Sequence, residues 1–172
     1  MTINTTDQQV FQALGTFIQL ILPDLVVIQG QQNRTPMPKT DFCLMNNVGK
    51  RRLSMNHVSY TDTTDQQTLN ADQSTEYTIQ IDFYGAKAGE NAQSIFTLIN
   101  DGYGWDAFPD YVKPLTTGDP VQTPLITGEK QYLERWRVDV KMQYNPVVTA
   151  PIQFFDDVDI ETINVSNNFQ SE

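Results

Sequence analysis

Apolar residues recur at helical spacing in two segments of the chain. The first stripe begins at Val10 and ends before Pro23, and Thr6 with Gln9 has the form of a capping box just ahead of it. The second stripe runs from Gly89 to about Asn100 and consists of Ala92, Ile95, Phe96 and Ile99. The pattern predicts two amphipathic helices, at about 7–21 and 89–100, each with one apolar face to pack on a sheet.

Two further segments, 74–84 and 133–144, alternate between apolar and polar residues. Their apolar positions are Tyr77, Ile79, Ile81 and Phe83 in the first segment and Trp136, Val138, Val140, Met142 and Tyr144 in the second. Such alternation is typical of a strand that is buried on one face only. If the two strands pair antiparallel, acids of one can meet bases of the other. Shorter strands are expected at 25–29, 42–46, 53–60 and near 158–165.

The order of these elements predicts one α+β domain spanning residues 1–172. Its expected core is a single mostly antiparallel (mixed) β-sheet with the two main α-helices packed on one face. Two segments, at about 61–74 and 109–130, show neither the helical nor the strand spacing of apolar residues. They are expected to be long loops. A structureless stretch as long as the second is uncommon unless it serves a purpose, such as an arm that reaches a neighbouring subunit. A flexible C-terminal tail is expected from about residue 166.

Charge and cysteine content narrow the class of partner. The formal net charge of -10 makes general attraction to nucleic acid phosphates and to anionic membranes unfavourable. Cys43 is the only cysteine, so the chain has neither an internal disulfide nor a cysteine-rich zinc site. No apolar run is long enough to span a membrane, and the first residues lack the basic start of a signal peptide. We therefore expect synthesis in the cytoplasm.

The sequence lacks the common catalytic signatures. It has no phosphate-binding loop, no dinucleotide-binding fingerprint and no zinc-protease or serine-hydrolase motif. Gly102 and Gly104 follow a helix, whereas phosphate loops precede one, so these glycines are interpreted as a helix stop. The only histidine, His57, is interpreted as a surface residue. A nucleophilic pair of His57 and Cys43 is the enzyme alternative, but we predict a protein that is not an enzyme and has no cofactor.

Two charged runs and one aromatic residue are candidates for a subunit interface. The acidic run can be a solvated face, a subunit interface, or a site for metal or acid-base chemistry. The basic run, in an otherwise acidic protein, can contact that acidic run in an identical neighbour, and such opposite patches suit a head-to-tail contact that closes into a ring. Trp105 lies in an aromatic segment that is either a satellite cluster under a loop or an interface anchor. The candidate residues are Lys50, Arg51, Arg52, Trp105, Asp156, Asp157, Asp159 and Glu161.

Several short motifs follow one another in an order that resembles the neck or tail terminator proteins of tailed bacteriophages. After the N-terminal helix come residues 26–33 (VVIQGQQN), 36–39 (PMPK), 42–45 (FCLM), 50–54 (KRRLS), 81–85 (IDFYG), 92–96 (AQSIF) and 133–146 (LERWRVDVKMQYNP). The segment with PMPK and the strand with RWRVD are the most telling. The resemblance covers about residues 5 to 165.

The resemblance implies a structural virion protein without catalysis. Such a protein forms a homo-oligomeric ring, typically a hexamer, that caps the head-proximal end of the tail tube and stops growth of tube and sheath. It also gives the head connector a docking surface, while genomic DNA passes through the channel without specific binding. The expected location is the virion neck, after assembly in the host cytoplasm.

Other functions fit the sequence less well. Within the same class, the alternatives are another head-tail joining protein or a tube subunit. From a different class, the alternative is a small α+β domain that binds a metal or ligand through Asp156, Asp157 and Asp159.

Overall fold

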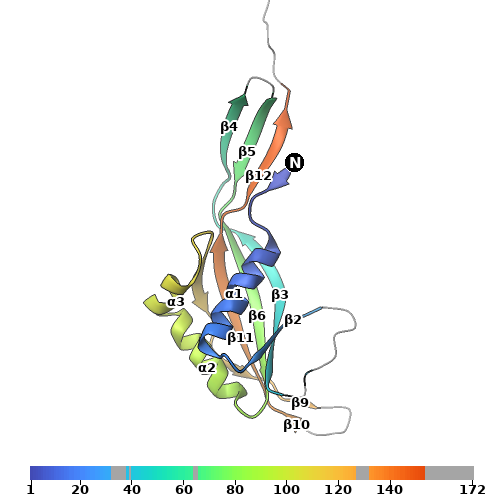
Figure 1. The fold of residues 1–172 in the computed structure, drawn as a ribbon, viewed down its shortest axis with the longest axis vertical. Coiled ribbons are helices and arrows are strands. Elements are labelled where there is room, and N and C mark those ends of the chain that lie inside the picture. Colours follow the sequence, from blue (N-terminus) through green and yellow to red (C-terminus); the bar gives the residue numbers. More distant parts are fainter. Residues whose placement is uncertain (32–37, 39, 64–65, 127–131, 154–172) are drawn as a thin grey trace, which may run out of the picture.

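The computed structural model describes residues 1–31, 38, 40–63, 66–126 and 132–153, and it has the predicted α+β class with mostly antiparallel strands. Figure 1 shows a body of helices and sheet from which a narrow arm of strands extends. The helices are α1 (Asp7–Ile21), α2 (Ala88–Ile99) and α3 (Gly102–Ala107). No helix in these ranges is long and apolar enough to span a membrane.

The body contains a six-stranded sheet in which β2 is parallel to β3 and the other pairs are antiparallel. The strand order is β2-β3-β6-β11-β7, and β8 also pairs with β11. The strands are β2 (Val26–Gln29), β3 (Phe42–Arg52), β6 (Thr75–Tyr84), β11 (Arg135–Tyr144), β7 (Val112–Thr117) and β8 (Val121–Gln122). A separate two-stranded sheet consists of β9 (Leu125–Ile126) and β10 (Tyr132–Leu133).

The apolar face of the body sheet carries the core, as the alternation predicts. Helices α1 and α2 lie across this face (Figure 1), and α1 begins at the predicted capping box, in which Thr6 and Gln9 exchange hydrogen bonds. Side chains of both helices meet the alternating residues of β6 and β11 in one buried cluster that includes Leu14, Phe17, Ile18, Ile95, Tyr77, Ile79, Ile81, Phe83, Val138, Val140 and Met142. This packing fixes which sheet face is covered.

The arm is a second, four-stranded antiparallel sheet, which the sequence analysis did not predict as a separate sheet. Its order is β1-β12-β5-β4. Its strands are β1 (Thr2–Ile3), β12 (Val147–Ile152), β5 (Gln66–Asp72) and β4 (His57–Thr63). The expected long loop at 61–74 is therefore wrong, because most of this segment belongs to the hairpin of β4 and β5. Its polar composition hides the strands, since Thr, Asn and Gln side chains occupy positions that need no burial.

The second expected loop, at 109–130, is also mostly strand where it is described. It supplies β7, β8 and β9, while residues 127–131 lie outside the described ranges. The prolines do not prevent this, because β7 and β8 lie at the border of the sheet, where a strand tolerates residues that cannot donate a hydrogen bond. The expected strand near 158–165 and the tail from about 166 fall outside the described residues.

Three strands of the arm continue three strands of the body in the same lateral order. Strand β3 leads into β4, β5 leads into β6, and β11 leads into β12, with short breaks at residues 53–56, 73–74 and 145–146. Hydrogen bonds cross these breaks from Leu53 N–H to the Ser74 carbonyl (2.9 Å) and from Gln73 N–H to the Pro146 carbonyl (3.2 Å). The body and the arm are thus two parts of one long ribbon of strands.

The predicted helix stop at Gly102 and Gly104 is also the beginning of α3. Helix α2 ends at Ile99, and the Asp101 side chain accepts a hydrogen bond from the Gly102 N–H at the start of α3. Gly104 is buried against the end of α2, and a Cβ atom there would lie 2.6 Å from the Leu98 carbonyl oxygen. The absence of a side chain at Gly104 therefore lets α3 pack directly on α2.

We expect Gly104→Ala to destabilise the protein by about 1 to 3 kcal/mol, because the added methyl group would overlap backbone atoms that cannot move independently. Gly102→Ala is the matched control, because a Cβ at that position meets no atom within 4 Å. Chemical denaturation of both variants measures the difference in the free energy of unfolding. Equal stability of the two variants would contradict the close packing of α3 on α2.

Candidate subunit interface

The arm has one apolar face and one polar face, because its residues alternate across four paired strands. The registers place Ile3, Val148, Ala71 and Val58 in one row across the sheet, and Ala150, Leu69 and Tyr60 in the next row on the same face. The opposite face carries mostly hydroxyl and amide side chains. There Asn70 donates a hydrogen bond to Thr61 Oγ1 and accepts one from Thr149 Oγ1, both at 2.8 Å.

None of the helices in the described part of the chain covers the apolar face of the arm. Helix α1 lies over the body, and the arm projects beyond it (Figure 1). All seven residues of β4 are exposed, and the side chains of Tyr60, Ile3 and Val58 are 67%, 50% and 44% exposed. A sheet with an apolar face and nothing packed on it is incomplete as an isolated fold. This face, defined here by Ile3, Val58, Tyr60, Leu69, Ala71, Val148, Ala150 and Ile152, is called the arm face below.

The arm face continues the helix-covered face of the body. From Val138 to Ile152, through β11, the break at residues 145–146 and β12, every second residue is apolar, and those in the two strands lie on this side. The first part of this row, up to Tyr144, is buried under the helices, whereas Val148, Ala150 and Ile152 in the arm are half-buried. The alternation that predicted β11 therefore extends past its end, and this signal could have identified β12 from the sequence.

A hollow of about 460 Å³ lies where the arm joins the body, at the base of the arm face. Its apolar lining includes Ile3, Ala71, Pro146 and Val148, while Lys50 and Arg52 supply positive charge beside them. Among the described residues Arg52 has no ion-pair partner. The hollow therefore combines apolar surface with an available guanidinium group.

The structure separates the three residues of the predicted basic run. Lys50 lies on the helix side, 2.5 Å from Asp7 and 4.9 Å from the centre of the Tyr77 ring. Partial burial of Lys50 lowers its pKa, but its hydrogen bonds to Asp7 and Tyr144 outweigh this effect and raise the pKa overall. Arg51 points to the opposite sheet face, where it forms an ion pair with Glu76 (2.9 Å). Lys50 and Arg52 thus share a side, and Arg51 does not.

The sheet face opposite the helices is polar and satisfies many of its own charges. Asp82, which is 1% exposed, accepts hydrogen bonds from Arg135 and Gln80, and Arg137 pairs with Asp139 at 2.9 Å. The Arg135–Asp82 pair joins β11 to β6 as expected, whereas the Arg137–Asp139 pair lies within β11. Because the buried Asp82 carboxylate depends on Arg135, losing the arginine would leave an uncompensated buried charge. Much of this charge therefore supports the fold.

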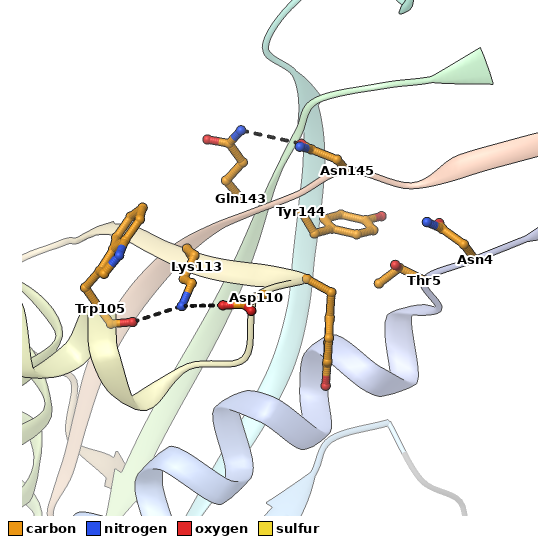
Figure 2. A pocket seen from close by; sticks show the side chains of 9 residues that line it. Asn4, Thr5, Trp105, Asp110, Lys113, Gln143, Tyr144 and Asn145 are labelled. Carbon is orange, nitrogen blue, oxygen red and sulfur yellow. Dashed lines mark hydrogen bonds and ion pairs between the residues drawn. The ribbon is translucent and has the colours of Figure 1, made fainter. Parts of the chain in front are cut away.

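Trp105 lies on α3 at the surface of the body, with its side chain 53% exposed. Figure 2 shows it beside Lys113, whose ammonium group lies 5.6 Å from the centre of its indole ring. Lys113 also donates to the carbonyls of Trp105 and Phe108 and contacts Asp110 at 3.5 Å. The aromatic segment is divided, because Phe108 is buried against Phe17 whereas Trp105 stays exposed.

The predicted acidic residues Asp156, Asp157, Asp159 and Glu161 lie outside the described residues. In the described part of the chain, no group of three or more histidine, cysteine or acidic residues could hold a metal ion. His57 is exposed on the arm opposite Asp72, whereas Cys43 is buried in the body sheet opposite Phe83. The structure therefore does not bring the two residues of the enzyme alternative together.

An apolar sheet face of this kind is typical of surfaces that bind other proteins, membranes or ligands. The family model described as phage neck terminator protein matches residues 8–169, which is most of the chain. The chain belongs to this family of phage neck proteins. This membership confirms the resemblance found in the sequence. A search of curated proteins finds no match.

The buried thiol of Cys43 gives a test of the fold and of the nucleophile alternative. Burial raises the pKa of Cys43 from 9.0 to about 12, so the neutral thiol is the form that the fold favours. This contribution to stability is present in full below pH 9 and is lost as the pH rises toward 12. We expect a thiol-specific reagent at pH 8 to modify the native protein at least about a hundredfold more slowly than the unfolded chain. Similar rates in the two states would contradict the burial of Cys43.

Proposed function

We propose that this phage neck protein forms a closed ring of identical subunits, most simply a hexamer, at the head-proximal end of the tail tube. In this position the ring stops growth of the tube and of any sheath, and it presents a docking surface to the head connector. Genomic DNA passes through the channel, and the net charge of -10 disfavours binding to its phosphates. The family membership supports the location, and the surface of the arm supports the self-association.

The uncovered arm face is the observation that carries the proposal. Complete burial of an aliphatic side chain such as Val58 or Ile3 contributes about 1.5 to 3 kcal/mol, so covering several of them at once is a substantial driving force. The arm projects from the body, which places this face where another subunit can reach it (Figure 1). A neighbouring copy of the chain is always available at the site of assembly.

A ring needs two different contact surfaces on each subunit, because contact between identical patches closes a dimer. We assign one surface to the arm face together with the positively charged residues where the arm joins the body, Lys50 and Arg52. Arg51, which lies on the opposite side and already pairs with Glu76, is a weaker candidate for this contact than the sequence suggested. Adjacent bodies also touch in a closed ring, and the exposed Trp105 on α3 is the residue we propose for that contact.

Substituting Tyr60→Asp tests the arm face. The new carboxylate would have to be desolvated in the contact, so we expect the subunit dissociation constant to rise at least about tenfold. Light scattering over a wide concentration range, with electron microscopy of large species, measures assembly of the protein alone and with purified tail tubes.

Ser59→Asp is the matched control, because Ser59 is the adjacent exposed residue and lies on the polar face of the same strand. We expect this control to assemble like the unmodified protein. If Tyr60→Asp assembled equally well, the arm face would not be the contact. If the unmodified protein formed no ring either alone or on tail tubes, the proposed function itself would be wrong.

A further inference from the structure

We infer that the C-terminal segment of one copy, residues 154–172, binds along the arm face of the next copy and places its carboxylates against Arg52 and Lys50. This inference rests on the proposed self-association and identifies the part of the neighbour that covers the arm. The charge, the chain length and the open strand edge of the arm support it independently.

The composition of the segment complements the base of the arm. Residues 154–172 contain five acidic residues and neither lysine nor arginine. In the stretch 157–161, acids alternate with Val158 and Ile160, so an extended chain would present an acidic side and an apolar side. The hollow at the base of the arm offers apolar lining next to Lys50 and Arg52. The hollow can therefore contact both kinds of side chain in the segment, because its cations and its apolar lining lie next to each other.

The arm geometry favours a neighbouring copy as the source of the segment. Strand β12 ends at Ile152, which is opposite Gln67 near the tip of the arm, whereas Arg52 lies at the base, opposite Thr75. The eight residue steps from Gln67 to Thr75 span roughly 26 Å of strand. Asp156 is four residues beyond Ile152 and can reach at most about 14 Å from it.

Within one chain, the backbone of Asp156 therefore reaches the near end of the hollow at Val148 but not Arg52. Asp159, seven residues beyond Ile152, reaches at most about 25 Å even without the reversal of direction that this path requires. A segment from another copy has no such restriction, because its 19 residues can span about 60 Å when extended. The acidic residues of another copy can thus reach Arg52 at the base of the arm more readily than those of the same chain.

The outer edge of the arm can bind the segment through its backbone. Strand β4 pairs with β5 on one side and with no described strand on the other. An open strand edge of this kind binds an extended chain by adding a strand to the sheet. The apolar residues Val58 and Tyr60 of β4 border this edge, so a strand added there would lie directly beside the arm face.

Disulfide cross-linking between variants that each carry one added cysteine tests which copy supplies the segment. One sample carries Val58→Cys, a second carries Val158→Cys, and the two are mixed under assembly conditions and oxidised. We expect a disulfide-linked heterodimer that forms at least about tenfold faster than with Ser59→Cys, the control on the polar face. The native Cys43 is buried and reacts slowly. A cross-link that forms only within a chain carrying both substitutions would overturn the inference.

A charge test in the full-length chain separates this inference from the proposed function. Replacing Asp156, Asp157 and Asp159 by Asn and Glu161 by Gln should raise the subunit dissociation constant at least about tenfold and reduce its dependence on salt. The control neutralises four exposed acids in the body, Asp24, Glu90, Asp106 and Asp119, and changes the net charge equally. Ring formation that is equally strong in both variants would refute the role of the segment and leave the ring intact.

Discussion

The structure depends on one constraint, which is that the apolar face of a long strand ribbon must be covered. Three strands pass from the body into the arm without changing their order, and the alternation in β11 and β12 keeps the same side apolar throughout. The two long helices cover this side only in the body. Within the described residues, the chain therefore completes a helix-covered core in the body half of the ribbon only.

The distribution of charge follows the same division. On the polar face of the body, Asp82 and Glu76 are matched by Arg135 and Arg51, so these charges hold neighbouring strands together. At the base of the arm, Arg52 has no such partner among the described residues, although the protein as a whole is strongly acidic. An available cation beside apolar surface can fix the orientation of a bound partner.

The helices and the two central strands could be predicted from the sequence because their periods are strong and their caps are explicit. The capping box at Thr6 and the alternation around Ile79 and Val140 each have one structural interpretation. The hairpin of β4 and β5 could not be recognised in this way, because residues such as Thr61 and Asn70 face solvent or one another and carry no hydrophobic signal. Prolines concealed β7, since Pro114 is tolerated close to the border of the sheet.

The candidate interface was predicted less completely than the fold. The sequence identified Lys50 and Arg52 by their charge, but it could not show that Arg51 lies on the other side of the sheet and pairs with Glu76. It also missed Tyr60 and Leu69, because a residue becomes an interface candidate only when the folded chain leaves it uncovered. The partner of Arg51 and the exposure of Tyr60 both depend on which segments of the folded chain lie side by side. A single sequence does not give this information.

The continuity of strands between body and arm has a mechanical consequence. A force applied along the arm would pass through the covalent chains of β4, β5 and β12 into β3, β6 and β11. Because the backbone hydrogen bonds of antiparallel strands lie perpendicular to the strands, such a force shears many of them together and does not open them one at a time. The joint between arm and body is therefore built to resist tension along the strand direction.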